Sequence, residues 1–278
     1  MIQKSYDNSK YGKLYLIPTP IGNLEDITYR AISTLKEVDI VYAEDTRETI
    51  KLLKNFDISK KVESCHKYTD MMHKDKIVDI LKSGKNIGYV TDRGTPLISD
   101  PGNVIVDNCI ENGITVIALP GPNAILPAIN MSGLSNEKFL FYGFLNSKNT
   151  IAKKELMDLK DIKQTLIFYE SPYRIKETLK LIENVLGNRK AAIVREISKL
   201  YEEVIRDNIA NLIKMVENIK GEIVLVVEGN KEEKVDNLDY QELVNNLIEK
   251  GYTKRDAVRE IADKYNISKN KLYNMVSD

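Results

Sequence analysis

The residues of this chain that are best placed to do chemistry lie in a loop rich in glycine and proline, TDRGTPLISDPG at positions 91–102. The loop directly follows the apolar run from Ile87 to Val90, and it carries two carboxylates. An apolar run of this length predicts a buried strand. Because an open α/β sheet binds its ligand at the carboxyl ends of its strands, we expect this loop to line a binding site.

Two further loops of the same kind follow apolar runs elsewhere, PTPIGN at 18–23 and PGPNA at 120–124. The three loops together hold six of the eight prolines. Proline fixes φ and glycine permits close backbone approach, so such loops can present main-chain donors and acceptors with little ordering cost on binding. Each loop alone is more typical of a tight turn that caps a strand of the sheet. The three together predict a shaped crevice.

The sequence lacks the signatures of the commonest nucleotide and metal sites. PTPIGN stands where a G-x-G-x-x-G fingerprint would follow the first strand, and there is no GK[ST] phosphate loop. Cys65 and Cys109 have no nearby partner, and the two histidines, His66 and His73, are isolated. We therefore expect no disulfide framework, no thiolate zinc site and no other metal.

The elements that must position these loops alternate between short apolar strands and amphipathic helices. Strands are expected at residues 14–17, 40–43, 87–90, 115–119, 139–144, 165–169, 191–194 and 222–227. Helices are expected at residues 29–37, 46–54, 71–81, 103–112, 150–159, 173–186 and 209–220. This alternation predicts an α/β fold with a mainly parallel first sheet. The simplest division is an N-terminal α/β domain, 1–134, a second α/β domain, 135–230, and a polar linker at 230–237.

The last forty or so residues contain no strand-like run, and we expect a helical appendage over 238–278. Its helices are expected at 239–250, 254–265 and 268–276. Asn266 and Ile267 would join the last two helices, and Ser268 would be an N-cap, which is the layout of a helix-turn-helix. Between Lys250 and Lys271 there are seven basic and three acidic residues. This local charge favours contact with nucleic acid, although a small helical bundle with a solvated charged face has the same pattern.

Composition restricts the class of protein only broadly. The 278 residues include 41 basic and 41 acidic side chains, so net charge gives no argument for nucleic acid beyond a local patch. No run approaches the roughly 20 apolar residues that cross a bilayer. The chain starts with a polar segment, MIQKSYDNSK, that does not resemble a signal peptide. We expect a soluble, cytoplasmic protein.

Seven segments, in order along the chain, carry a resemblance to one known family. They read PTPIGNLEDIT at 18–28, AEDTR at 43–47, TDRGTPLISDPG at 91–102, LPGPNA at 119–124, ESPYRI at 170–175, REISK at 195–199 and KGEIVLVVEG at 220–229. Together they resemble the ribosomal RNA small subunit methyltransferase I family, 2′-O-ribose cytidine methyltransferases of the tetrapyrrole methylase superfamily. The resemblance covers roughly residues 12–229, and the helical tail resembles the family's helix-turn-helix appendage.

The resemblance implies two α/β domains of tetrapyrrole methylase type with S-adenosylmethionine in the cleft between them, normally in a homodimer. The substrate it implies is 16S ribosomal RNA in the small ribosomal subunit. The residues it places against the cofactor are Ile21, Asp92, Gly94, Thr95, Ala124, Ile125, Tyr169, Arg195 and Gly221. Asp92 is expected to bind the amino acid portion of the cofactor or, alternatively, to cap its own turn.

The chemistry implied is an in-line attack of a ribose hydroxyl on a sulfonium methyl group. The protein must align the reacting atoms and remove a proton from a weakly acidic alcohol. The candidate bases or proton relays are Glu44, Asp45, Glu170 and Lys199. Arg47, Arg174 and Arg195 are candidates to neutralise phosphate or the cofactor carboxylate. Alternatively, Glu44 with Arg47 and Glu170 with Arg174 form structural ion pairs.

Two positions depart from the pattern of the family. Arg93 stands where the family usually has Ala, so it either contacts the substrate or points to solvent. The stretch from His66 to Asp70 stands where the family usually has Glu-His-Asn, and His66 either takes over a polar role there or lies on the surface. Both departures bear on substrate recognition more than on cofactor binding.

Two other functions remain open at this point. One is a methyltransferase of the same superfamily that acts on a small tetrapyrrole; the basic helical tail and AEDTR argue against it, because a small-molecule enzyme needs neither. The other is a non-catalytic RNA-binding or assembly protein, and the intact set of cofactor loops argues against that.

Overall fold

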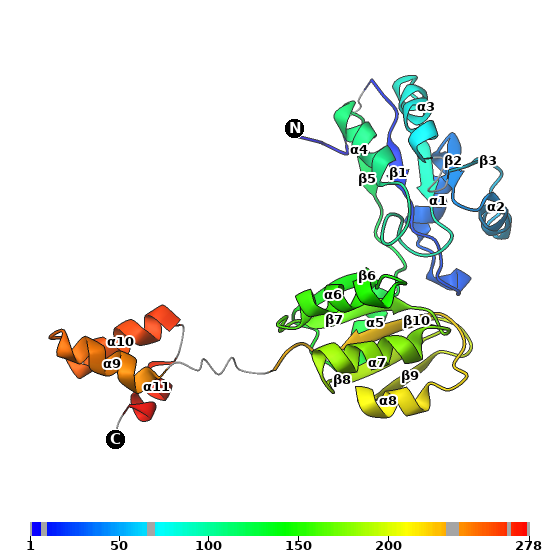
Figure 1. Ribbon diagram of the computed structural model, residues 1–278. Helices are drawn as coiled ribbons and strands as arrows, with labels where there is room; N and C mark the ends of the chain where they lie inside the picture. Colours follow the sequence, from blue (N-terminus) through cyan, green and yellow to red (C-terminus); the bar gives the residue numbers. More distant parts are fainter. Residues whose placement is uncertain (1, 7–9, 66–69, 232–238, 266–267, 277–278) are drawn as a thin grey trace. The chain divides into compact units, whose positions relative to one another are not determined.

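The computed structural model describes residues 2–6, 10–65, 70–231, 239–265 and 268–276. By their internal contacts the residues form two compact units, Met1–Asn230 and Lys231–Asp278 (Figure 1). The first unit holds both β-sheets, and the second is helical. No helix within the described ranges is long and apolar enough to span a bilayer.

The first sheet is parallel throughout and has the strand order β3-β2-β4-β1-β5. Its strands are β1 (Leu14–Leu16), β2 (Ile40–Ala43), β3 (Lys61–Ser64), β4 (Ile87–Val90) and β5 (Val116–Ala118). Parallel sheets need cover on both faces, which explains why their strands read as continuous apolar runs. Because the strands share one direction, the loops that follow β1, β2, β4 and β5 leave from the same edge of the sheet.

Four helices supply that cover. The helices α1 (Tyr29–Glu37) and α2 (Thr46–Asn55) pack on one face, and α3 (Asp70–Lys82) and α4 (Asn103–Glu111) pack on the other. The alternation of β2 divides its side chains between the two cores: Tyr42 packs with α3 and α4, whereas Val41 packs with α1 and α2. A short 3₁₀ helix, η1 (Leu24–Asp26), follows the first loop.

The second sheet is mixed and has the order β6-β7-β10-β8-β9. Its strands are β6 (Phe139–Phe144), β7 (Thr165–Glu170), β8 (Lys190–Arg195), β9 (Glu203–Asn208) and β10 (Ile223–Val227). Only β6 and β7 pair in parallel; the other pairs are antiparallel. The register pairs Ile223 with both Glu170 and Arg195. The ends of β7 and β8 therefore lie beside the start of β10.

Helices also cover both faces of the second sheet (Figure 1). The helices α6 (Asn149–Leu159), α7 (Ile175–Leu186) and α8 (Ile209–Met215) pack on one face, and α5 (Ile125–Ser132) packs on the other. The helix α5 precedes the domain boundary predicted at 134/135, yet its residues Ala128 and Ile129 pack with the second sheet. The boundary itself stays a prediction.

The helical unit consists of α9 (Tyr240–Glu249), α10 (Lys254–Tyr265) and α11 (Lys269–Met275) around a small core that includes Val244, Ile261 and Leu272. Ser268 occupies the N-cap position of α11, but its side chain makes no capping hydrogen bond. The predicted connection, Asn266 and Ile267, lies outside the described residues, as do most of the predicted linker and His66. The predicted α/β fold with a helical C-terminal appendage is confirmed.

Several elements differ from the expectations. The strands β3 and β9 were not predicted, because both are edge strands with charged residues rather than apolar runs. The helix α5 was not predicted because Pro127 interrupts its pattern, although proline is tolerated in a first helical turn. The helix α8 ends at Met215 rather than at Lys220; Asn218 has a left-handed φ of 62° and cannot continue it.

Candidate active site

The three loops rich in proline and glycine are tied together by hydrogen bonds. Thr19 and Gly94 exchange both backbone N–H···O bonds at 2.9 Å. The Thr19 hydroxyl donates to the Thr91 carbonyl at 3.1 Å, and the Thr95 hydroxyl donates to the Pro122 carbonyl at 3.0 Å. Loops that are far apart in the sequence therefore meet at one edge of the first sheet.

The loop at 91–102 has an unusual backbone. Leu97 and Ser99 have φ of 74° and 65°, the left-handed region that costs a non-glycine residue about 1–3 kcal/mol. Gly102 has φ of 117°, and a Cβ there would lie 2.7 Å from Leu97 Cδ2 and 2.9 Å from the Tyr89 ring. Such strain persists only where the surrounding structure fixes it, and it is typical of functional loops. The loop thus holds Ser99 and Asp100 in a defined orientation.

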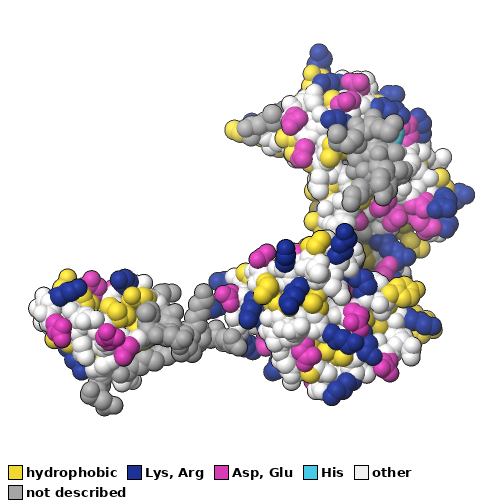
Figure 2. Space-filling view, in the orientation of Figure 1, with side chains coloured by type: hydrophobic (Ala, Val, Ile, Leu, Met, Phe, Trp, Pro, Cys, Tyr) yellow, Lys and Arg dark blue, Asp and Glu magenta, His cyan; other side chains and the backbone are white. Residues whose placement is uncertain are grey.

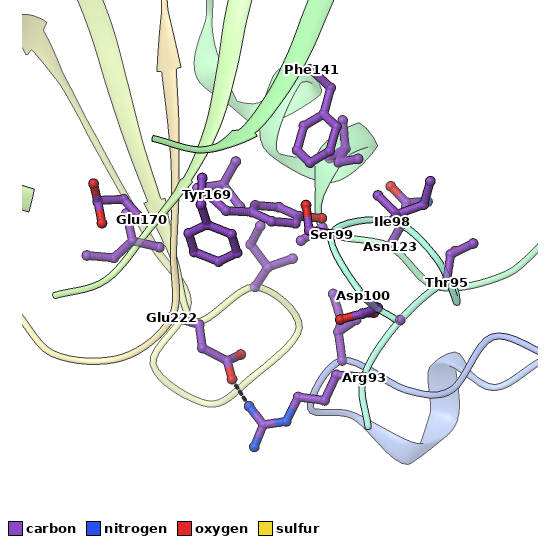
Figure 3. A pocket seen from close by; sticks show the side chains of 18 of the residues that line it. Arg93, Thr95, Ile98, Ser99, Asp100, Asn123, Phe141, Tyr169, Glu170 and Glu222 are labelled. Atoms are coloured by element: carbon purple, nitrogen blue, oxygen red, sulfur yellow. Dashed lines mark ion pairs between the residues drawn. The ribbon is translucent and has the colours of Figure 1, made fainter. Parts of the chain in front are cut away.

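The loops border a cavity of about 670 Å³ (Figure 3). Seven of the nine predicted cofactor residues line it: Ile21, Gly94, Thr95, Ala124, Ile125, Tyr169 and Gly221. The first three come from loops of the first sheet, Ala124 and Ile125 lie at the start of α5, and the last two lie at the adjacent ends of β7 and β10. The structure therefore brings together residues that the sequence spreads over some two hundred positions.

Aromatic rings form one wall of this cavity. The Tyr169 ring lies 4.9 Å from the Phe141 ring and 5.5 Å from the Phe144 ring, centroid to centroid. Burial, and then the nearby charge of Asp100, raise the pKa of Tyr169 to about 12. Tyr169 is therefore a neutral hydroxyl at physiological pH. The sequence did not point to Phe141 or Phe144, since aromatic residues in a strand are ordinary core residues.

The other two predicted cofactor residues lie elsewhere. Asp92 does not line the large cavity; its carboxylate accepts a hydrogen bond from the backbone N–H of Asp45 at 2.9 Å. Arg195 donates to the Glu203 carboxylate at 2.5 Å and to the Lys220 carbonyl at 3.2 Å. Arg195 borders a separate hollow of about 440 Å³ on the other side of Gly221.

A third hollow, of about 410 Å³, adjoins the large cavity, and we call it the polar pocket. Five carboxylates, one arginine and one threonine line it: Glu44, Glu48, Asp92, Asp100, Glu222, Arg93 and Thr91. Arg93, Asp100 and Glu222 line the large cavity as well. The two hollows therefore share a wall made of charged side chains.

Arg93 and Glu222 in that shared wall form an ion pair, drawn as a dashed line in Figure 3. Glu222 also accepts a hydrogen bond from Lys199 at 2.9 Å, and Lys199 donates to Glu196 at 2.9 Å. The predicted base Lys199 is thus engaged in ion pairs with two carboxylates. Arg93 does not simply point to solvent, because it connects the loop after β4 with the start of β10.

Asp45 and Arg47 form the exposed pair that the sequence allowed as an alternative to catalysis, but with Asp45 rather than Glu44 as the partner. The Arg47 guanidinium donates to both carboxylate oxygens of Asp45, at 3.1 and 2.7 Å. These bonds lower the pKa of Asp45 to about 2. Asp45 also caps α2 by accepting from the Arg47 backbone N–H at 2.8 Å. A carboxylate with so low a pKa is a poor proton acceptor.

Glu170 is buried and turned away from the other labelled side chains of the large cavity (Figure 3). It accepts hydrogen bonds from the Thr178 hydroxyl at 2.5 Å and from the Ser171 backbone N–H at 2.7 Å. Arg174 lies 3.6 Å from it and donates to the carbonyls of Leu145 and Asn146. This geometry is that of a structural ion pair that connects β7, α7 and the segment after β6.

Asp100 is the functional candidate that the sequence did not assign. It is partly buried, and it accepts a hydrogen bond from the Thr91 hydroxyl at 2.9 Å. Burial raises the pKa of Asp100, the Thr91 hydrogen bond lowers it, and the charge of Asp92 raises it again; the net shift is upward. The signal available in the sequence was only its place in the 91–102 loop.

The large cavity fits the cofactor that the resemblance implies, S-adenosylmethionine. Small-molecule sites are concave, several hundred Å³ in volume and mostly apolar with a few placed polar groups. This cavity has aromatic and aliphatic walls, and Gly94 lets the backbone line it directly, with φ of 80°. Thr95, Ser99 and Asn123 supply polar groups at its edge. Apolar surface can hold an adenine ring, and these polar groups can bind its sugar and amino acid parts.

Comparisons of the sequence with a family model and with known proteins agree on one family. Residues 13–213 match the family described as Tetrapyrrole (Corrin/Porphyrin) Methylases. A ribosomal RNA small subunit methyltransferase I from Bacillus subtilis is 46% identical over 95% of this chain and 94% of its own length. A protein of the same name from Vibrio cholerae is 40% identical over 94% of this chain and 92% of its own length.

Solved structures agree at the level of the fold. Uroporphyrin-III C-methyltransferase from Thermus thermophilus, complexed with S-adenyl homocysteine, has a TM-score of 0.58 at 17% identity and covers 78% of this chain and 97% of its own. Diphthine synthase has a TM-score of 0.62 at 15% identity and covers 80% of this chain and 92% of its own. The family match and the relatives that are 40% identical or more confirm the predicted class of cofactor, S-adenosylmethionine, and the predicted methyltransferase activity. The chain belongs to the tetrapyrrole methylase family and, within it, to the ribosomal RNA small subunit methyltransferase I family.

Proposed function

We propose that this protein transfers a methyl group from S-adenosylmethionine to the 2′-hydroxyl of a cytidine in 16S ribosomal RNA. The observation that carries the proposal is the pair of hollows with a shared wall. An apolar cavity of about 670 Å³ suits the cofactor, and the polar pocket of about 410 Å³ beside it suits a sugar. The curated relatives that match this chain over nearly their whole length are named for ribosomal RNA methylation.

The polar pocket favours a hydroxyl-rich group over a phosphate. Its lining has five carboxylates and one arginine, and that arginine is paired with Glu222. Carboxylates accept hydrogen bonds from ribose hydroxyls and from the exocyclic amine of cytosine, and they repel phosphate oxygens. The sugar and base would therefore enter the pocket while the phosphates stay outside it.

S-adenosylmethionine supplies a methyl group on a positively charged sulfur, which is already a good leaving group. The residues of the large cavity bind the cofactor and exclude water: Ile21 and Ile125 supply apolar contacts, and the ring of Tyr169 lies among them. Side chains in the shared wall lie where the sugar and the methyl group would meet. Alignment of the two is the main task of the protein, and removal of the hydroxyl proton is the second.

Recognition of the RNA would depend on shape and local patches more than on overall charge. The chain has 41 basic and 41 acidic residues, and on the face drawn in Figure 2 the two kinds of charge are interspersed. We propose that the substrate is the assembled small ribosomal subunit, that the protein acts as a homodimer in the cytoplasm, and that basic residues of the helical unit such as Arg255 and Arg259 approach the RNA backbone.

Product analysis tests this proposal. The purified protein is incubated with small ribosomal subunits that lack the modification and with S-adenosylmethionine labelled in its methyl group, and the RNA is digested to nucleosides. The expected product is labelled 2′-O-methylcytidine. Label in any other nucleoside, or on a base, would contradict the assignment of the substrate. Bound cofactor without transfer to RNA would favour a small-molecule methyltransferase instead.

A further inference from the structure

The shared wall of the two hollows contains one carboxylate without an ion pair among the described residues, and that carboxylate is Asp100. Three side chains line both hollows, Arg93, Asp100 and Glu222. Arg93 and Glu222 neutralise each other, and Glu222 also binds Lys199. Asp100 receives only a neutral donor, the Thr91 hydroxyl at 2.9 Å. It is thus the acceptor in this wall that is best able to take a proton.

The other carboxylates of the polar pocket either have their own partners or lie away from the large cavity. Glu48 pairs with Lys51 at 2.6 Å, and Asp92 accepts from the backbone N–H of Asp45. Glu44 accepts from Thr91 at 3.4 Å, but it does not line the cofactor cavity. A base for methyl transfer must reach the hydroxyl at the point where the hydroxyl meets the methyl group. Only a group in the shared wall satisfies this condition.

We propose that Asp100 is the general base of the methyl transfer and that Thr91 positions it. This inference rests on the proposed function, since it concerns the same site. The ribose 2′-oxygen forms a bond to the methyl carbon while the bond from that carbon to sulfur breaks and its electron pair goes to sulfur. The O–H bond breaks at the same time, and its proton goes to a carboxylate oxygen of Asp100. Asp100 later releases the proton to water in the polar pocket.

The surroundings of Asp100 suit this task. Its pKa lies above the ordinary 3.8, first because of burial, so the carboxylate holds a proton better than an exposed aspartate. The charged and titratable groups around it are Asp92 and Arg93 on its own loop, Glu44 after β2, Glu48 on α2, Tyr169 on β7 and Glu222 before β10. Most of them are acidic, so they favour uptake of a proton by Asp100 once the hydroxyl is bound.

The Asp100→Asn variant tests the role of Asp100, because the amide keeps an oxygen that can accept from Thr91 and has nearly the same shape. We expect its single-turnover rate on small subunits to fall about 100-fold or more at saturating cofactor, the range of a lost general base. Its affinity for S-adenosylmethionine, measured by calorimetry, should stay within about threefold of the unaltered protein. Asp100→Glu should recover part of the rate. Asp107→Asn, an exposed position on α4 that borders neither hollow, is the matched control.

The dependence of rate on pH gives a second readout. In the unaltered protein the single-turnover rate should rise with pH by the titration of one carboxylate and then level off, and Asp100→Asn should lack this rise. Transfer by Asp100→Asn within about threefold of the unaltered protein would overturn the proposal, as would a loss that excess cofactor restores. If the Asn variant does not fold, the pH profile of the unaltered protein is the test: a rate that stays level to a pH below 3.8, the ordinary aspartate pKa, overturns the proposal.

The same experiments distinguish a wrong proposed function from a wrong role for Asp100. Every series begins with the unaltered protein and nucleoside analysis of its product. Absence of 2′-O-methylcytidine there refutes the proposed function, whatever the variants do. Formation of 2′-O-methylcytidine by both the unaltered protein and Asp100→Asn at similar rates refutes only the role of Asp100.

Discussion

The large cavity and the polar pocket share a wall but differ in chemistry. The cavity, of about 670 Å³, has a wall of Phe141, Phe144 and Tyr169 and apolar surface from Ile21 and Ile125. The polar pocket, of about 410 Å³, is lined by five carboxylates, an arginine and a threonine. Apolar walls contribute binding free energy through burial, whereas carboxylates bind hydrogen-bond donors and can exchange protons. From this difference we infer that cofactor binding and proton transfer are divided between adjacent hollows.

A substitution that fills the apolar cavity should have the largest effect. Ile125 lies at the start of α5 and lines the cavity, so Ile125→Trp places a ring where the cofactor would bind. We expect affinity for S-adenosylmethionine to fall by about 100-fold, because steric exclusion removes most cavity contacts. Calorimetric titration measures it. Ile151→Trp, at an exposed site on α6, is the control. Unchanged affinity in Ile125→Trp would place the cofactor elsewhere.

Asp92→Ala tests whether Asp92 acts in the polar pocket or in cofactor binding. The sequence resemblance assigned Asp92 to the cofactor, but its carboxylate lines the polar pocket and accepts from the Asp45 N–H. We expect the single-turnover rate to fall about tenfold and stability to fall by about 1 kcal/mol, the net value of one hydrogen bond. Cofactor affinity should change less than about threefold. The opposite pattern, weak cofactor binding with a normal rate at saturation, would return Asp92 to the cofactor site.

Thr91→Val alters proton transfer without adding bulk. The Thr91 hydrogen bond lowers the pKa of Asp100, so its removal raises that pKa further. A base with a higher pKa becomes deprotonated at higher pH, and the acid limb of the rate profile should therefore move to higher pH. We expect the rate on that limb to fall by about three- to tenfold. Single-turnover rates across the acid range measure the shift; movement of the limb to lower pH would contradict the role given to Thr91.

Arg93→Ala should have the smallest effect, on stability. The side chains of Arg93 and Glu222 are 56% and 57% exposed, and such surface ion pairs contribute about 0–1 kcal/mol. We expect the free energy of unfolding, measured by denaturant titration, to change by less than about 1 kcal/mol. A much larger loss would mean that this pair fixes the wall between the two hollows.

The sequence predicted the fold class, the cofactor class and the three loops, because each depends on a local pattern. Apolar runs followed by glycine and proline mark strand ends, and the parallel order of the first sheet then brings those ends together. Seven of the nine predicted cofactor residues consequently line one cavity. The resemblance to a known family supplied the identity of the cofactor, which composition and periodicity could not.

Most of what the sequence did not predict depends on contacts between residues that are far apart in the chain. The edge strands β3 and β9 acquire their structure by pairing with β2 and β8, and their own residues are charged or polar. The orientation of Asp100 follows from the left-handed backbone of Leu97 and Ser99. Leucine and serine rarely adopt this conformation, so the sequence does not predict it. The candidate bases Asp45, Glu170 and Lys199 have suitable side chains, but the structure places each in an ion pair. Among their partners only Glu222, which pairs with Lys199, is far away in sequence.

A crystal structure of the protein with S-adenosylhomocysteine and a cytidine nucleotide bound would test the division of tasks between the two hollows. We expect the sulfur-bearing ligand in the cavity of about 670 Å³ and the ribose in the polar pocket. We also expect the 2′-oxygen about 3 Å from a carboxylate oxygen of Asp100. A ribose held away from Asp100, with another group of the protein beside its 2′-oxygen, would contradict the division of tasks between the two hollows.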